Sequence, residues 1–143
     1  MHSPQEFDFC EIEVDSEFSH TYTVDENVHD AMASTFNDRS PIHVDETYAV
    51  AEGFRGRVMH GAILNGFLSH FVGMRFPGKR SLLTSVTINY NHPFYLDEEI
   101  RLTARVRQKV ESQRVIVLDF KFSNADSGVK IASGKAQVVV RGA

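Results

Sequence analysis

Two residue types that often act together in acid–base chemistry stand five positions apart in segment 38–43, which reads D-R-S-P-I-H. Pro41 stiffens this segment and biases the residue before it away from the helical conformation. A stiff turn can direct the carboxylate of Asp38 and the imidazole of His43 at one point, a pair suited to general acid–base work on a water molecule or a carbon acid. Spacing alone leaves open a structural alternative, in which Asp38 caps the turn and His43 is an ordinary, partly buried histidine.

A second candidate is Gly61, within the V-M-H-G-A sequence of residues 58–62. It stands at or near the start of an apolar stretch with helical character, where backbone N–H groups have no intrahelical partner. Such amides stabilise an oxygen that gains negative charge, and glycine lets a ligand approach closely because it has no Cβ. The alternative is a glycine that serves only the packing of helix against sheet.

Other common reactive centres are missing from the sequence. Cys10 is the single cysteine, which excludes a disulfide framework and a thiolate zinc site. No H-E-x-x-H, G-x-S-x-G, G-x-G-x-x-G or Walker A pattern occurs. His60 and His70 are ten residues apart, which would put them on different faces of one helix. We therefore expect no metal site, no usual covalent nucleophile and no nucleotide cofactor held by such loops.

The composition is that of a single globular domain. The chain has 143 residues, 42% of them hydrophobic, and a formal net charge of −4. This length suits one domain, residues 1–143, with a real core. An acidic chain offers no concentrated basic face for nucleic acid. We see no signal peptide and no segment suited to crossing a membrane, so the expected location is the cytoplasm.

The elements that must position these residues follow from the hydrophobic periodicity. We predict a strand at 17–24, a helix from Asp25 to Phe36, a turn at 37–41 and a short helix at 46–52. Segment 60–74 is apolar nearly all the way round, so we expect a helix that is buried on most sides. From residue 82 onward the period is two, which predicts strands at 82–90, 100–106, 114–122 and 129–140. This order favours an α+β fold, an antiparallel sheet wrapped around a central buried helix.

Segment 36–49 resembles the signature of the R-specific (type 2) enoyl-CoA hydratases, the MaoC-like branch of the hot-dog fold. That signature reads approximately G-D-x-N-P-[LIV]-H-x(5)-[AS]. Residues 53–61 are similar to the family's F-x-x-x-[IV]-x-H-G segment, which opens the hot-dog helix. Asn37 and Ser40 depart from the pattern, which commonly has Gly and Asn there. The positions that match the signature are Asp38, Pro41, Ile42, His43 and Ala49.

The resemblance, which covers almost the whole chain, implies a mechanism. Asp38 and His43 hold one water, and Asp38 takes its proton as the oxygen attacks C3 of a trans-2-enoyl thioester. His43 orients the water and shares in returning a proton to C2, while the N–H of Gly61 stabilises the enolate-like oxygen. The product is an (R)-3-hydroxyacyl thioester, and the reverse reaction is dehydration. Neither a metal nor a redox cofactor is required.

The resemblance also implies where the substrate lies and how the chain assembles. The acyl chain would run along the central helix, and plain core packing is the alternative role for most of the helix residues. The family pairs two sheets edge to edge, so we expect a homodimer, with a dimer of dimers as the larger alternative. The residues expected to bind substrate are Ser40, His60, Leu64, Leu68, Ser69 and Val72.

Three other functions remain open on the same fold. A 3-hydroxyacyl dehydratase acting on acyl carrier protein would share the mechanism, and the sequence does not separate it from a coenzyme A enzyme. An acyl-CoA thioesterase generally places a carboxylate on or beside the central helix, and segment 58–74 has none. A non-catalytic subunit that binds acyl thioesters would be expected to lack Asp38 or His43, and both are present. Acyl chain length and physiological direction are not fixed by the sequence.

Overall fold

The computed structural model describes residues 2–142, which form five strands and four α-helices. The strands are β1 (Glu17–Thr23), β2 (Ser81–Tyr90), β3 (Glu99–Val110), β4 (Val115–Asn124) and β5 (Lys130–Val140). The helices are α1 (Glu26–Thr35), α2 (Pro41–Val44), α3 (Glu46–Ala51) and α4 (Ala62–His70), with 3₁₀ turns at Phe9–Glu11 and Glu111–Gln113. A π-helical turn, Phe71–Arg75, extends α4.

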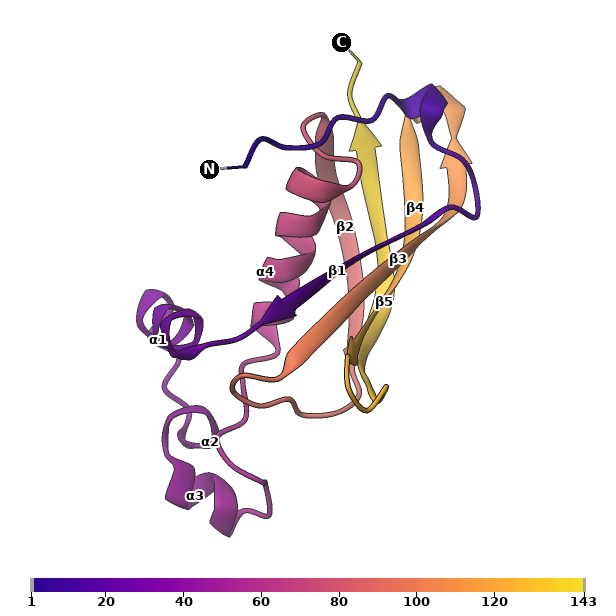
Figure 1. Ribbon diagram of the computed structural model, residues 1–143. Helices are drawn as coiled ribbons and strands as arrows, with labels where there is room; N and C mark the ends of the chain where they lie inside the picture. Colours follow the sequence, from indigo (N-terminus) through magenta and orange to yellow (C-terminus); the bar gives the residue numbers. More distant parts are fainter. Residues whose placement is uncertain (1, 143) are drawn as a thin grey trace.

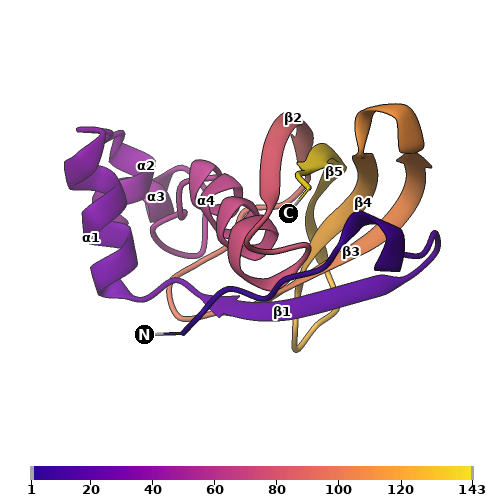
Figure 2. The same cartoon turned by 90° about the horizontal axis from the view of Figure 1, so that it is seen from above.

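The strands form one antiparallel sheet in the order β1-β3-β4-β5-β2. Seen from above, the sheet curves around α4 (Figure 2). Side chains alternate between its two faces, as the period of two predicts, and one face of β3 is fully buried. The expected α+β architecture is therefore confirmed. The residues on that buried face of β3 are Ile100, Leu102, Ala104 and Val106.

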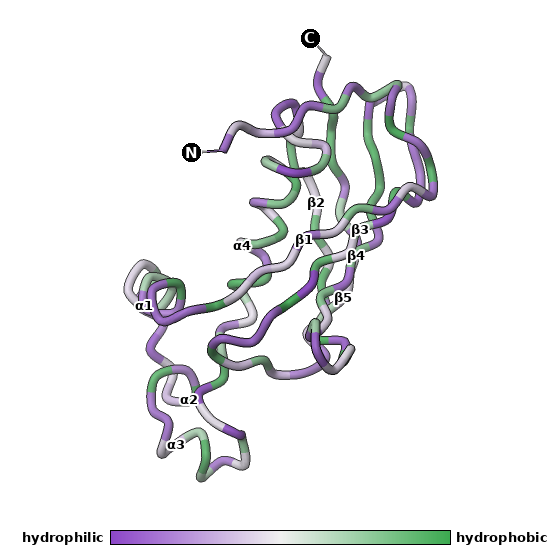
Figure 3. The backbone as a smooth tube through the Cα atoms, viewed as in Figure 1, coloured by the Kyte–Doolittle hydropathy of each residue, from purple (hydrophilic) through white to green (hydrophobic). Residues whose placement is uncertain are grey.

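Helix α4 packs one face against the sheet and leaves the other face uncovered (Figures 1 and 3). Leu64 and Leu68 are fully buried on the inner face, whereas Gly66 and Ser69 are exposed. The prediction of burial on most sides is thus wrong for the single chain. The physical reason is that one curved sheet covers only one side of a helix.

Two local predictions also need correction. The central helix begins at Ala62, so His60 lies in the extended segment ahead of it and the comparison of His60 with His70 on one helix does not apply. Residues predicted as a turn include the start of a short helix, because Pro41 takes its first position, where a missing N–H costs nothing.

The other three helices lie near the N-terminal end of α4 (Figure 1). Two of them begin at the predicted caps: the Asp25 side chain accepts a hydrogen bond from the amide of Val28 at 2.9 Å, and Asp45 accepts one from Tyr48 at 3.0 Å. Helix α1 buries His29 and Ala33 on its inner face. Within residues 2–142, no helix is long and apolar enough to cross a membrane.

Candidate active site

The segment that carries Asp38 and His43 is shaped by the end of α1 and the start of α2. Asn37, just after α1, has a φ of 51°, in the left-handed region that asparagine tolerates better than most residues. This explains why asparagine can stand where the family pattern has glycine. Ser40 then precedes Pro41, and its side chain is exposed and makes no capping hydrogen bond.

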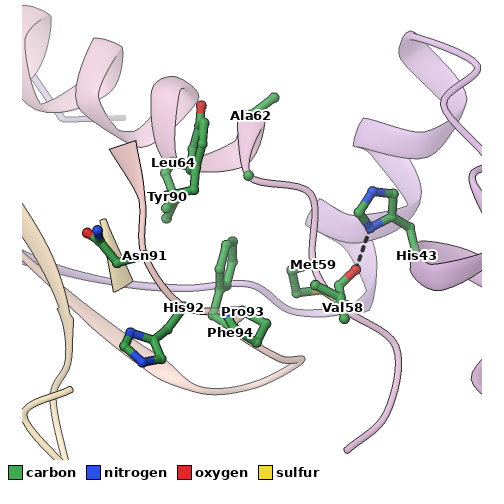
Figure 4. A pocket seen from close by; sticks show the side chains of 11 residues that line it. His43, Val58, Met59, Ala62, Leu64, Tyr90, Asn91, His92, Pro93 and Phe94 are labelled. Atoms are coloured by element: carbon green, nitrogen blue, oxygen red, sulfur yellow. Dashed lines mark hydrogen bonds between the residues drawn. The ribbon is translucent and has the colours of Figure 1, made fainter. Parts of the chain in front are cut away.

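The ring of His43 is oriented by a backbone carbonyl. Its Nδ1 lies 2.6 Å from the carbonyl oxygen of Val58 (Figure 4). A carbonyl can only accept, so Nδ1 must carry the proton. The neutral ring therefore has its unprotonated nitrogen at Nε2, which is free to accept a proton from a reacting group.

His60 touches both members of the Asp38–His43 pair. Its Nε2 lies 2.9 Å from the carbonyl oxygen of Asp38, so that nitrogen must carry the proton it donates. Its ring stacks on that of His43, with centroids 4.0 Å apart and planes 26° apart. Because only 2% of His60 is exposed, the surrounding packing holds its ring in place against the pair. The structure thus places His60 behind the site rather than in its wall.

Asp38, His43 and His60 bring one ligand atom each to within 4.8 Å of one another, a grouping that could hold a metal ion. A histidine nitrogen binds a metal through a lone pair in the plane of its ring. The two imidazole planes are stacked rather than convergent, so His43 and His60 cannot both bind one ion unless a ring turns. The expectation that no metal is bound stays a prediction.

A cavity of about 530 Å³ lies between the segment before α4, the first turn of α4 and the segment that follows β2 (Figure 4). His43 and Gly61 both line it, so the structure brings these two predicted residues to one space. Most of the wall is apolar, as is usual for a small-molecule site. The lining residues are His43, Val58, Met59, Gly61, Ala62, Leu64, Tyr90, Asn91, His92, Pro93 and Phe94.

Gly61 is the N-cap residue of α4 and immediately precedes its first helical residue, Ala62. It faces the ring of Tyr90, and a Cβ at position 61 would lie 3.0 Å from two ring carbons. The Tyr90 hydroxyl donates a hydrogen bond to Oδ1 of Asn65 on α4, which holds the ring over the helix start. Burial raises the pKa of Tyr90, so this hydroxyl keeps its proton at neutral pH.

The remaining predicted residues fall into three groups. Leu64 lines the cavity, as expected of a residue that contacts the acyl chain. Leu68 and Val72 are buried in the core and are not among the residues that line the cavity, and Ser69 is exposed. Ser40 lies outside the lining as well. In the single chain, therefore, only the first turn of α4 reaches the cavity, and the substrate contacts stay predictions.

Sequence reasoning did not single out the segment that follows β2 as part of a site. Tyr90, His92 and Phe94 close the cavity opposite the helix. The Nδ1 of His92 lies 2.9 Å from the carbonyl oxygen of Lys130, which fixes that ring. The available signal was Pro93, which lies three residues beyond the end of β2 at Tyr90 and marks an irregular segment there. Nothing in the strand's own pattern says which helix it faces.

Comparison with known proteins is consistent with this geometry. The family described as MaoC like domain matches residues 9–123, and the chain belongs to this family. An (R)-specific enoyl-CoA hydratase from Rhodospirillum rubrum is 27% identical over 103 residues, which are 72% of this chain and 70% of the relative. A hydratase of the same description from Aeromonas caviae is 24% identical over 108 residues, which are 76% of this chain and 80% of the relative.

Solved structures show the same fold. An unliganded R-hydratase, PhaJ1, from Pseudomonas aeruginosa superposes with a TM-score of 0.90 at 21% identity, over 98% of this chain and 89% of that one. The R-hydratase from A. caviae gives a TM-score of 0.85 over 91% of this chain and 98% of that one. The hot-dog fold that the resemblance implied is therefore confirmed.

Proposed function

We propose that this protein is a hydro-lyase that reversibly hydrates trans-2-enoyl-CoA to (R)-3-hydroxyacyl-CoA by syn addition of water. The observation that carries the proposal is the meeting of His43 and Gly61 in one largely apolar cavity, with Asp38 beside His43. A base, an acid and an oxyanion-stabilising amide are the three groups that such a reaction needs.

In the proposed mechanism, Asp38 and His43 hold the reacting water between them. Asp38 takes one proton from the water as its oxygen forms a bond to C3 of the enoyl thioester. His43, whose Nδ1 is committed to the carbonyl of Val58, orients the water through its unprotonated Nε2. The proton that Asp38 took then passes through this Nε2 to C2, so that both side chains return to their starting protonation states. The double bond becomes single, and no atom is lost, because water adds across C2 and C3.

The thioester oxygen gains negative charge while the C–O bond to C3 forms. The amides of Ile63 and Leu64 donate to the carbonyls of His60 and Gly61, whereas among the described residues no backbone carbonyl accepts from the amides of Gly61 and Ala62. These two amides lie at the N-terminus of α4, where the positive end of the helix dipole adds to the effect. Gly61 lines the cavity, and the Tyr90 ring lies so close that a Cβ at this position would meet it at 3.0 Å. The acyl chain would then lie against Leu64 and its apolar neighbours in the wall.

We propose further that two chains pair through the edge of β2. In the described part of the chain this strand pairs only with β5, so one row of its backbone groups is open. Leu82 and Tyr90 are 55% and 52% exposed on the same strand, which is unusual for large apolar side chains on a monomer surface. A dimer would cover this edge and could enclose the cavity. Light scattering should then give twice the chain mass of 16.1 kDa.

The test of function is the loss of the enoyl-thioester absorbance when crotonyl-CoA is mixed with wild type, Asp38→Asn or His43→Gln. We expect wild type to hydrate crotonyl-CoA, and each variant to lower kcat by about 10²–10⁴-fold because one proton-transfer group is removed. Asp126→Asn, in the exposed loop between β4 and β5, and His70→Asn, at the far end of α4, are the matched controls.

Three results would contradict the proposal or redirect it. Release of free coenzyme A would indicate a thioesterase instead. Tight binding of crotonyl-CoA without turnover would indicate a binding subunit. Turnover of crotonyl groups on acyl carrier protein but not on coenzyme A would assign the same chemistry to the other carrier. Chiral chromatography of the product decides between the (R) and (S) alcohols.

A further inference from the structure

His29 is a buried histidine that the proposed mechanism does not use. It lies on the inner face of α1 and is 1% exposed. Its ring is 5.4 Å from that of His60, between centroids, with the planes 41° apart. Three imidazoles therefore follow one another from the core to the cavity, namely His29, His60 and His43.

The two inner rings share an unusual feature. Among the residues that the structure describes, neither the Nδ1 of His29 nor the Nδ1 of His60 has a hydrogen-bond partner, and both atoms are buried. A buried polar atom left unpaired costs about 1–3 kcal/mol, so two of them side by side call for an explanation. Core packing alone does not supply one, since an apolar residue at position 29 would avoid the cost.

The protonation of the two rings makes them complementary. His60 carries its proton on Nε2, which faces the Asp38 carbonyl, so its Nδ1 is a bare acceptor. Burial lowers the pKa of His29, and Arg57 and His60 lower it further, against smaller opposing effects of Asp30 and Glu26. His29 is therefore neutral and can carry its single proton on Nδ1. The ring centroids are 5.4 Å apart and the two Nδ1 atoms make no direct hydrogen bond, a spacing at which one ordered water can join a donor to an acceptor.

We propose that His29 is a positioning residue, whose Nδ1–H holds the Nδ1 of His60 through one water. His60 in turn fixes the backbone of Asp38 through its Nε2–H and the ring plane of His43 by stacking. A substitution at His29 would thus change the position of the reacting groups, although His29 touches neither the substrate nor the reacting water. The kinetic part of this inference rests on the proposed hydratase function.

The test compares His29→Leu with His29→Asn. Leucine fills space but cannot donate, whereas the asparagine amide places an N–H close to where Nδ1 of histidine stands. We expect His29→Leu to lower kcat for crotonyl-CoA by about 10- to 100-fold with KM nearly unchanged, because loss of alignment by a fraction of an ångström is costly. His29→Asn should recover most of this loss. Equal losses in the two variants, or wild-type kcat in His29→Leu, would overturn the proposal.

A second measurement does not depend on catalysis. In ¹⁵N-labelled protein, the Nδ1 resonance of His60 should be that of a hydrogen-bonded acceptor in wild type and in His29→Asn. It should move to that of an unbonded nitrogen in His29→Leu. An unbonded signal in wild type overturns the proposal, even if His29→Leu does not fold. If wild type hydrates no enoyl thioester, the proposed function fails while this spectrum still decides the role of His29.

Discussion

The two ends of the central helix both carry histidines, in opposite electrostatic settings. At the N-terminal end, His43 and His60 donate to backbone carbonyls and lie beside the carboxylate of Asp38. At the C-terminal end, His20 accepts from the guanidinium of Arg75 at 2.9 Å, and His70 hydrogen-bonds the hydroxyl of Tyr22 at 2.8 Å. A cavity of about 320 Å³ lies at this second end too, and no carboxylate lines it.

The difference shows what makes a histidine fit for proton transfer. A carbonyl only accepts, so it fixes which ring nitrogen is protonated and leaves the other one free. At the second end, burial and Arg75 together lower the pKa of His20, which disfavours its charged form. The hydroxyl of Tyr22 can donate or accept, so it does not fix the proton of His70. This is why we propose acid–base work for the first end and not for the second.

The strongest test of this contrast is the hydrogen bond from His60 to the Asp38 carbonyl. In His60→Phe the stack on His43 is kept but the donor is lost, and we expect kcat for crotonyl-CoA to fall by about 10²-fold because the Asp38 turn shifts. His60→Gln can place an amide N–H near the lost Nε2 and should retain clearly more activity. If phenylalanine and glutamine behave alike, the hydrogen bond does not position Asp38.

A smaller effect is expected where α4 begins. In Gly61→Ala the new Cβ meets the Tyr90 ring at 3.0 Å, so the ring or the helix start must give way, and we expect kcat/KM to fall about tenfold through the disturbed amide. Gly66→Ala is the matched control, because nothing lies within 4 Å of a Cβ there. That variant should keep full activity and gain up to about 1 kcal/mol of stability. Full activity in Gly61→Ala would remove this amide from the mechanism.

Site residues that lie close together along the chain could be predicted from the sequence. Site residues that only the tertiary fold brings together could not. Asp38, His43 and Gly61 belong to short motifs, and these could be found by type and spacing. The family resemblance assigns Leu68 and Val72 to the substrate because it places the acyl chain along the central helix. The cavity reaches only the first turn of that helix, and only the three-dimensional packing determines this.

The wall residues and the inner histidine could not be predicted for the same reason. Tyr90 and Phe94 come to the site because β2 pairs with β5 and the segment after β2 then bonds to the segment before α4, where the Met59 amide donates to the Phe94 carbonyl. His29 stands at an ordinary helical position, and nothing local distinguishes a buried histidine from an exposed one. Its role arises from contact with His60, 31 positions away along the chain. By contrast, the caps Asp25 and Asp45 act within one turn, and their prediction is confirmed.

The buried ring of His29 also predicts how stability depends on pH. Its pKa is lowered in the folded protein, so the unfolded state binds more protons as pH falls below about 6.5, and the free energy of unfolding must decrease. The slope from one such group is at most about 1.4 kcal/mol per pH unit. Urea unfolding at about pH 7.5 and pH 5.5 should show a smaller decrease in His29→Leu than in wild type. An unchanged decrease would mean that His29 binds a proton equally well in both states.

The smallest effect is expected for a substitution of His70, at the C-terminal end of α4. His70 is exposed and hydrogen-bonded to a side chain, so His70→Asn, which keeps a polar group near Tyr22, should change the free energy of unfolding by less than about 0.5 kcal/mol. It should also leave kcat unchanged, whereas His60→Gln, equally conservative, should not. Kinetics with crotonyl-CoA and urea unfolding check both statements. If His70→Asn lowers kcat as much as His60→Gln, the protonation pattern set by backbone carbonyls is not what separates the two ends, and the second cavity takes part in the reaction.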